Sequence, residues 1–282
     1  MRLEGVYTAL VTPFADGAVD AAAFAALVER QVAAGVAGLV PCGTTGEAPT
    51  LERDEWTDLI AATVRIAKGR VPVIAGCGTN STRSTVEALA AARALGADAG
   101  MVVFPYYNKP DPAGLRAHVE ACARVGLPLV LYHVPGRTGQ RLPEAQLAAL
   151  CNLPGVVALK EATGDVALGA ALLDQTPAAI LSGDDFTFPA LVAMGGHGVI
   201  SVLSNVAPRL TVAWDAAARA GDRAAVARLR TRLLPLVAAL FSRSNPIPVK
   251  AALAAQGHIQ NELRLPLSPG PALDPSLLAG LE

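Results

Sequence analysis

Lys160 has the clearest chemical potential in this sequence. The chain contains four lysines, and only Lys160 closes an apolar run that is typical of a core strand, Val156 to Lys160. Burying an ammonium group is costly, so a buried lysine is biased toward the neutral amine. A neutral amine can attack a ketone, and the resulting protonated imine acidifies the neighbouring carbon. The pattern predicts Schiff-base chemistry at Lys160; the alternative is a structural ion pair with Glu161 or another carboxylate.

Three of the four tyrosines are predicted to lie at the same rim of the fold. Tyr132 closes one predicted strand, and Tyr106 and Tyr107 follow the strand before it. Phenol hydroxyls can donate or accept a proton, and the hydroxyl of Thr44 could link two of them. The competing interpretation for each tyrosine is packing in a core or an interface.

Two further segments could bind an anion. Arg137, in Gly136-Arg137-Thr138-Gly139, could hold a carboxylate through two parallel hydrogen bonds, although a loop arginine can also be a solvated surface charge. The loop from Gly43 to Glu47 could bind a carboxylate through the N–H groups of Gly43, Thr44 and Thr45, or could simply form a turn.

Short apolar runs alternate with helix-length amphipathic segments as far as about Asn205, which is typical of βαβ units. The eight predicted strands are Gly5 to Val11, Gly38 to Pro41, Val71 to Ala75, Gly100 to Phe104, Leu127 to Tyr132, Val156 to Lys160, Ala178 to Leu181 and Gly198 to Ser201. The predicted helices between them include Asp20 to Ala34, Leu51 to Ala67 and Thr82 to Leu95. Eight strands favour a (β/α)8 TIM barrel over a doubly wound sheet, whose GxGxxG fingerprint is missing. Barrel active sites lie at the carboxyl ends of strands, where Lys160 and Tyr132 fall.

After Asn205 the strand signals stop. Leu210 to Ala220, Asp222 to Leu240 and Ile247 to Gln256 predict successive helices. We therefore expect a barrel core over residues 1–205 and a C-terminal helical region over residues 206–282 that packs on the barrel within one domain.

Composition narrows the classes of partner. The 282 residues are 52% hydrophobic and carry a formal net charge of -1, which gives no electrostatic preference for nucleic acid or anionic lipid. No apolar span is long enough for a bilayer and the start lacks the regions of a secretory signal, so we expect a cytoplasmic protein. The cysteines form no CxxC pair and the histidines lack ligand spacing, which predicts buried free thiols and no metal.

Together these segments resemble the dihydrodipicolinate synthase and N-acetylneuraminate lyase superfamily, and its dihydrodipicolinate synthase branch most closely. The resemblance covers nearly the whole chain. Its landmarks are Gly43-Thr44-Thr45-Gly46-Glu47, Pro105-Tyr106-Tyr107-Asn108-Lys109-Pro110, Tyr132-His133-Val134-Pro135-Gly136-Arg137-Thr138-Gly139, Lys160-Glu161-Ala162-Thr163-Gly164, Ser182-Gly183-Asp184-Asp185, Gly195-Gly196-His197-Gly198-Val199-Ile200-Ser201 and Asn245-Pro246-Ile247-Pro248-Val249-Lys250.

The resemblance implies a class I lyase that condenses pyruvate with L-aspartate 4-semialdehyde to 4-hydroxy-tetrahydrodipicolinate, in lysine and diaminopimelate biosynthesis. It implies that Lys160 forms the Schiff base and that Tyr132 donates and accepts protons. Thr44 and Tyr107 would complete a relay, with Tyr107 contributed across a subunit interface of a homotetramer. No cofactor is expected, because the imine itself is the electron sink.

The resemblance also implies the substrate positions. Thr45 and Ile200 fall where pyruvate binds, Gly183 belongs to the same substrate site, and Arg137 falls where the semialdehyde carboxylate binds. Sugar-acid lyases of the superfamily usually lack that arginine, so its presence favours the synthase branch. Two other functions stay open: a related class I aldolase acting on a 2-keto-3-deoxy acid, and a non-catalytic paralogue that binds keto acids.

One departure from the family pattern lies beside the proposed catalytic tyrosine. The family usually has asparagine where this chain has His133, and we expect the histidine to be tolerated with adjusted hydrogen bonds.

A second departure concerns feedback by lysine. Asn80 and Tyr106 of the regulatory pocket are kept, but lysine-inhibited members carry polar, histidine and acidic residues at the positions of Ala48, Arg53, Trp56 and Ser84. Loss of an acidic partner at Ser84 weakens binding of the effector's ammonium group. We predict weak or absent inhibition by lysine, to be checked in an initial-rate titration. Half-inhibition at submillimolar lysine would contradict this expectation.

Overall fold

Eight parallel strands form the centre of the protein, whose computed structural model describes residues 3–281. They are β1 (Gly5–Ala9), β4 (Gly38–Val40), β5 (Ile74–Gly76), β6 (Ala99–Val103), β7 (Leu129–His133), β8 (Val156–Glu161), β9 (Ala179–Ser182) and β10 (Gly198–Ser201). Their order is β4-β1-β10-β9-β8-β7-β6-β5, and a parallel bridge between Leu39 and Val73 joins the two ends of the sheet. The strands therefore nearly close the (β/α)8 barrel that the sequence predicts.

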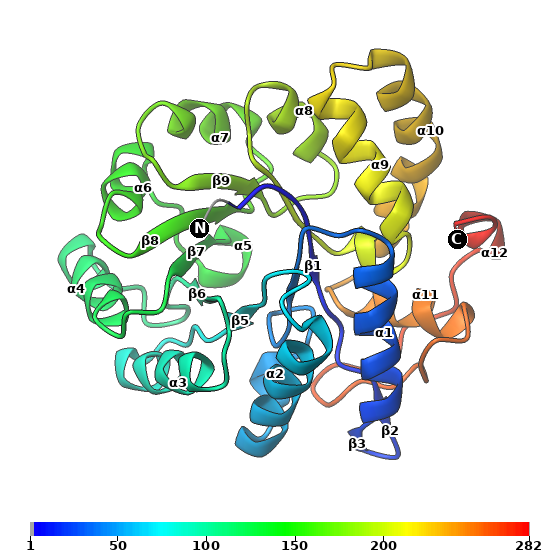
Figure 1. Ribbon diagram of the computed structural model, residues 1–282, viewed down its shortest axis with the longest axis horizontal. Coiled ribbons are helices and arrows are strands. Elements are labelled where there is room, and N and C mark those ends of the chain that lie inside the picture. Colours follow the sequence, from blue (N-terminus) through cyan, green and yellow to red (C-terminus); the bar gives the residue numbers. More distant parts are fainter. Residues whose placement is uncertain (1–2, 282) are drawn as a thin grey trace.

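Helices surround the strands on the outside of the barrel (Figure 1). The helices of this layer are α1 (Ala21–Ala33), α2 (Arg53–Ala67), α3 (Thr82–Ala94), α4 (Pro112–Ala123), α6 (Glu144–Cys151), α7 (Val166–Leu173), α8 (Phe188–Ala193) and α9 (Pro208–Arg219). The one-turn α5 (Pro135–Thr138) lies in the loop after β7. After α9, α10 (Arg223–Leu240) packs on α9, and α11 (Ile247–Ala255) and α12 (Pro275–Leu278) pack on α10. Local sequence sets several of their starts: Asp20, Ser81, Asp111 and Asp222 each accept an N–H of the first helical turn. Within residues 3–281 no helix has the length and apolarity to cross a membrane.

The observed strands differ from the predicted runs by a few residues, for local reasons. The third strand was expected from Val71 but begins at Ile74, because Pro72 has no N–H and the N–H of Val73 donates to the Asp98 carboxylate. The short hairpin of β2 (Phe14–Ala15) and β3 (Ala18–Val19) was not predicted, since two-residue strands leave no periodic signal. The one-turn helix α5 was missed for the same reason.

Side chains on β7 and β8 alternate between the barrel interior and the helix layer. Val130, Tyr132 and Ala158 belong to the cluster inside the barrel, whereas Leu131 and Leu159 belong to the larger cluster under the helices. Successive residues of a strand point to opposite faces. Lys160 therefore faces the interior with Ala158 and Tyr132, and its neighbours in sequence face the helices.

A buried ion pair ties the C-terminal helices to the barrel. Lys250 of α11 is fully buried, and its Nζ lies 2.6 Å from Glu47 Oε1, in the loop after β4. The same Nζ lies 4.2 Å from the centroid of the Phe14 ring, and Glu47 Oε2 accepts the N–H of Arg264. Burial lowers the pKa of Lys250, and the Glu47 carboxylate opposes that shift. The sequence placed Lys250 in a tail helix but did not predict this contact.

We predict that Lys250→Met strongly destabilises the fold, because it leaves the buried Glu47 carboxylate without its cation. The expected loss in the free energy of unfolding is about 3–5 kcal/mol, measured by urea denaturation. The double variant Glu47→Gln with Lys250→Met removes both charges and is expected to recover most of that loss. An unchanged urea midpoint for the single variant would rule out the pair as a structural tie.

Candidate active site

The register of two parallel strands brings Lys160 and Tyr132 together. Tyr132 of β7 pairs with Lys160 of β8, and Lys160 Nζ lies 4.3 Å from the centroid of the Tyr132 ring. Tyr132 is 6% exposed and Lys160 is 5% exposed. Both residues stand near the carboxyl ends of their strands, where the active sites of such barrels lie.

The ion pair with Glu161 that the sequence left open for Lys160 is absent. Glu161 faces the helix layer, where its Oε1 lies 3.5 Å from His133 Nδ1. Among residues 3–281, no carboxylate oxygen lies within 4.0 Å of the Lys160 amine. The described residues thus give the buried Lys160 amine no acidic partner, which rules out the ion-pair interpretation of this lysine.

Gly183 adjoins Lys160, and Ile200 lies in the same barrel interior. A Cβ at Gly183 would lie 3.0 Å from Lys160 Cε and 2.6 Å from Ala162 Cβ, so only glycine leaves this space open. The N–H of Gly183 donates to the carbonyl of Glu161, which fixes the end of β9 against β8. Ile200 of β10 is 1% exposed and belongs to the interior cluster that contains Tyr132.

The loop from Gly43 to Glu47 uses part of its backbone in a turn and leaves part free. The N–H of Gly46 donates to the carbonyl of Gly43, and the N–H of Glu47 donates to that of Thr44. The N–H groups of Gly43, Thr44 and Thr45 have no acceptor in the described part of the chain. The loop therefore forms the turn that the sequence allowed, and its three free N–H groups could donate to a carboxylate, which stays a prediction.

Asn245 links this loop to Arg137. Its Nδ2 donates to Thr45 Oγ1 at 2.9 Å, and its carbonyl accepts a hydrogen bond from the Arg137 guanidinium at 3.0 Å. Asn245 lies just before α11, more than 100 residues from Arg137 in sequence. The sequence marked Asn245-Pro246-Ile247-Pro248 as a landmark but gave Asn245 no role, because the contact is made only in the folded chain.

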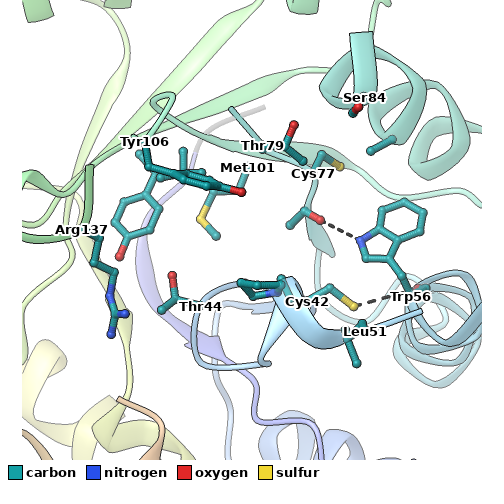
Figure 2. A pocket seen from close by; sticks show the side chains of 18 of the residues that line it. Cys42, Thr44, Leu51, Trp56, Cys77, Thr79, Ser84, Met101, Tyr106 and Arg137 are labelled. Atoms are coloured by element: carbon teal, nitrogen blue, oxygen red, sulfur yellow. Dashed lines mark hydrogen bonds between the residues drawn. The ribbon is translucent and has the colours of Figure 1, made fainter. Parts of the chain in front are cut away.

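A cavity of about 490 Å³ opens beside these residues. Thr44, Tyr106 and Arg137 lie at one side of it, whereas Trp56 and Leu51 lie at the other (Figure 2). Tyr132 also lines this cavity. Lys160 does not line this cavity itself but lies against the ring of Tyr132, which does. The fold therefore gathers the predicted residues Thr44, Tyr132 and Arg137 at one cavity.

Tyr107, the fourth predicted catalytic residue, lies away from this cavity. Its side chain is 89% exposed, on a backbone with φ of 70°, and it does not line the cavity. Within residues 3–281 no hydrogen bond joins the Thr44 hydroxyl to Tyr132 or to Tyr107. A relay through all three hydroxyls is therefore not formed within one chain.

The four cysteines are buried and free, as their spacing predicts. Burial raises the pKa of Cys122 to about 11 and that of Cys151 to about 12, and it also raises the pKa of Cys42 and Cys77, which line the cavity. A thiol with a raised pKa is a poor nucleophile at neutral pH. The amine of Lys160 is therefore the better candidate for covalent chemistry.

A model of the dihydrodipicolinate synthetase family matches residues 2–272. The chain belongs to this family. The 4-hydroxy-tetrahydrodipicolinate synthase of Maridesulfovibrio salexigens is 48% identical over 273 residues, which are 95% of this chain and 94% of that protein. Membership confirms the resemblance on which the predicted site depends.

Solved structures of dihydrodipicolinate synthases share the fold over the whole chain. The synthase of Thermotoga maritima is 41% identical with a TM-score of 0.94, and the match covers 100% of this chain and 98% of that one. The chloride-inhibited synthase of Acinetobacter baumannii, complexed with pyruvate, is 43% identical with a TM-score of 0.92, over 99% and 96% of the two chains. The predicted barrel is thus the fold of this family.

Proposed function

We propose that this chain is a 4-hydroxy-tetrahydrodipicolinate synthase, a lyase of lysine and diaminopimelate biosynthesis that condenses pyruvate with L-aspartate 4-semialdehyde. The observation that carries the mechanism is the buried amine of Lys160, which packs on Tyr132 and has no carboxylate partner in the described chain. The choice of substrates is supported by relatives named 4-hydroxy-tetrahydrodipicolinate synthase, such as the one that is 48% identical over 94% of its length.

The first half of the reaction joins pyruvate to Lys160. The neutral amine adds to the keto carbon, the carbonyl oxygen leaves as water, and a protonated imine remains. Tyr132 carries the protons of this step as general acid and base. The free N–H groups of Thr44 and Thr45 hold the pyruvate carboxylate, while Ile200 walls the interior side.

The second half makes the new C–C bond. The imine loses a proton from its methyl carbon to become an enamine, which attacks the aldehyde carbon of the semialdehyde. Arg137 holds the carboxylate of this second substrate in a bidentate contact. The amine of the second substrate then displaces Lys160 by transimination, which releases the cyclic product and the free lysine.

The relay from Tyr132 through Thr44 requires a further hydroxyl, which we assign to Tyr107 of a second copy of the chain. The high exposure of this ring supports the assignment, because burial in an interface would recover its apolar area. The proposed active form is a homo-oligomer, and a tetramer is the form that family resemblance implies.

Borohydride trapping tests the covalent step. We expect pyruvate plus borohydride to add the mass of one reduced adduct to the peptide that contains Lys160. Lys160→Ala is expected to abolish both the adduct and product formation, whereas Lys68→Ala, which changes an exposed lysine outside the site, retains both. If the protein mass is unchanged after reduction with pyruvate and borohydride, the proposed mechanism is wrong.

Arg137→Lys tests recognition of the second substrate. Lysine keeps the charge but cannot form the two parallel hydrogen bonds, so we expect the KM for the semialdehyde to rise by about tenfold or more. Trapping of pyruvate at Lys160 is expected to be unchanged. If the ratio of kcat/KM for the semialdehyde to kcat/KM for a 2-keto-3-deoxy acid is the same in the variant and the wild type, the role assigned to Arg137 is wrong.

A further inference from the structure

We infer that His133 is a positioning residue that closes the loop carrying Arg137 and thereby aims its guanidinium at the second substrate. This inference rests on the proposed function, and it concerns a residue outside the groups that contact substrate.

The loop starts at His133, and its last residue, Leu142, contacts His133 again. The chain leaves β7 at His133, forms α5 with Arg137 in it, and returns nine positions later, where the N–H of Leu142 donates to His133 Nε2 at 3.2 Å. His133 is fully buried and Leu142 is 7% exposed. Water therefore cannot replace this hydrogen bond at low cost, and the imidazole acts as a clasp between the two ends of the loop.

The same hydrogen bond determines which nitrogen of the ring carries the proton. An acceptor at Nε2 must present a lone pair, so the neutral ring has its proton on Nδ1. Nδ1 lies 3.5 Å from Glu161 Oε1, which also accepts the N–H of Thr163 at 2.8 Å. That separation is too long for a good hydrogen bond, so the Nδ1–H group faces the Glu161 carboxylate without bonding to it. The Phe104 ring packs against the imidazole with centroids 5.9 Å apart.

Other contacts of the loop hold its middle but do not return it to β7. Thr138 Oγ1 donates to the carbonyl of Val134, and Gln140 Nε2 donates to the carbonyl of Pro110. The Arg137 guanidinium itself donates to the carbonyl of Asn245. The guanidinium of Arg141, the residue before Leu142, also pairs with the Asp165 carboxylate at 2.8 Å, which attaches this end of the loop to the start of α7. Loss of the Leu142 contact would therefore remove only the tie to β7 and leave a buried N–H unpaired, so that Arg137 would keep its charge but lose its alignment.

Two substitutions separate the two ring nitrogens. The amide of asparagine reaches about as far as Nδ1, and the amide of glutamine reaches about as far as Nε2. His133→Asn therefore keeps a donor toward Glu161 but removes the acceptor for Leu142. His133→Gln keeps that acceptor and removes the donor toward Glu161, which makes it the matched control.

The experiment compares steady-state kinetics of the wild-type chain and the two variants. His133→Asn is expected to raise the KM for aspartate semialdehyde about fivefold to tenfold, while His133→Gln stays within about twofold of wild type. The KM for pyruvate and borohydride trapping at Lys160 are expected to be unchanged in both. A lower melting temperature of His133→Asn with an unchanged KM would overturn the inference, as would equal losses in the two variants.

Amide hydrogen exchange gives a readout that does not depend on catalysis. The Leu142 amide is expected to exchange faster in His133→Asn than in wild type and to stay protected in His133→Gln. Equal protection in all three proteins would show that His133 does not close the loop. If the wild-type chain could not be trapped with pyruvate, the proposed function would be wrong. The exchange measurement would still show whether His133 holds the Leu142 amide.

Discussion

The parallel register between β7 and β8 is the constraint on which the site depends. It sets Tyr132 opposite Lys160 and His133 opposite Glu161, with the first pair facing the barrel interior and the second facing the helices. A slip of one residue would exchange the two faces and put the Glu161 carboxylate where the Lys160 amine now lies. The Lys160–Tyr132 pair and the His133–Glu161 pair are thus fixed by the same backbone hydrogen bonds.

The C-terminal helices complete the site as well as cover the barrel. Asn245 joins Thr45 to Arg137, and Lys250 holds Glu47 at the end of the loop that contains Thr45. Two loops on separate strands are therefore connected through one short segment before and within α11. A change in this segment acts on the substrate site without touching the reacting atoms, in the same way as the clasp at His133.

Most of the fold and the interior half of the site could be predicted from the sequence. The eight apolar runs, with Lys160 and Tyr132 at the ends of two of them, carry strong local signals. Thr45 and Arg137 were candidates from their loops, and the family resemblance supplied the roles expected of them. The contacts of Asn245 and Lys250 could not be predicted, because each joins residues about 100 to 200 positions apart through tertiary packing. The interface assigned to Tyr107 lies beyond any single chain.

Burial alone does not distinguish the lysine that we propose forms the Schiff base. Lys250 is fully buried and Lys160 is 5% exposed, so a search for the most buried amine would choose Lys250. Lys250, however, is bonded to Glu47 and enclosed against Phe14, which occupies its amine and leaves no path for a keto acid. Lys160 has no carboxylate within ion-pair distance among the described residues and rests on a tyrosine that lines a cavity. The lack of a carboxylate partner among the described residues, next to space for a substrate, is what sets Lys160 apart from Lys250.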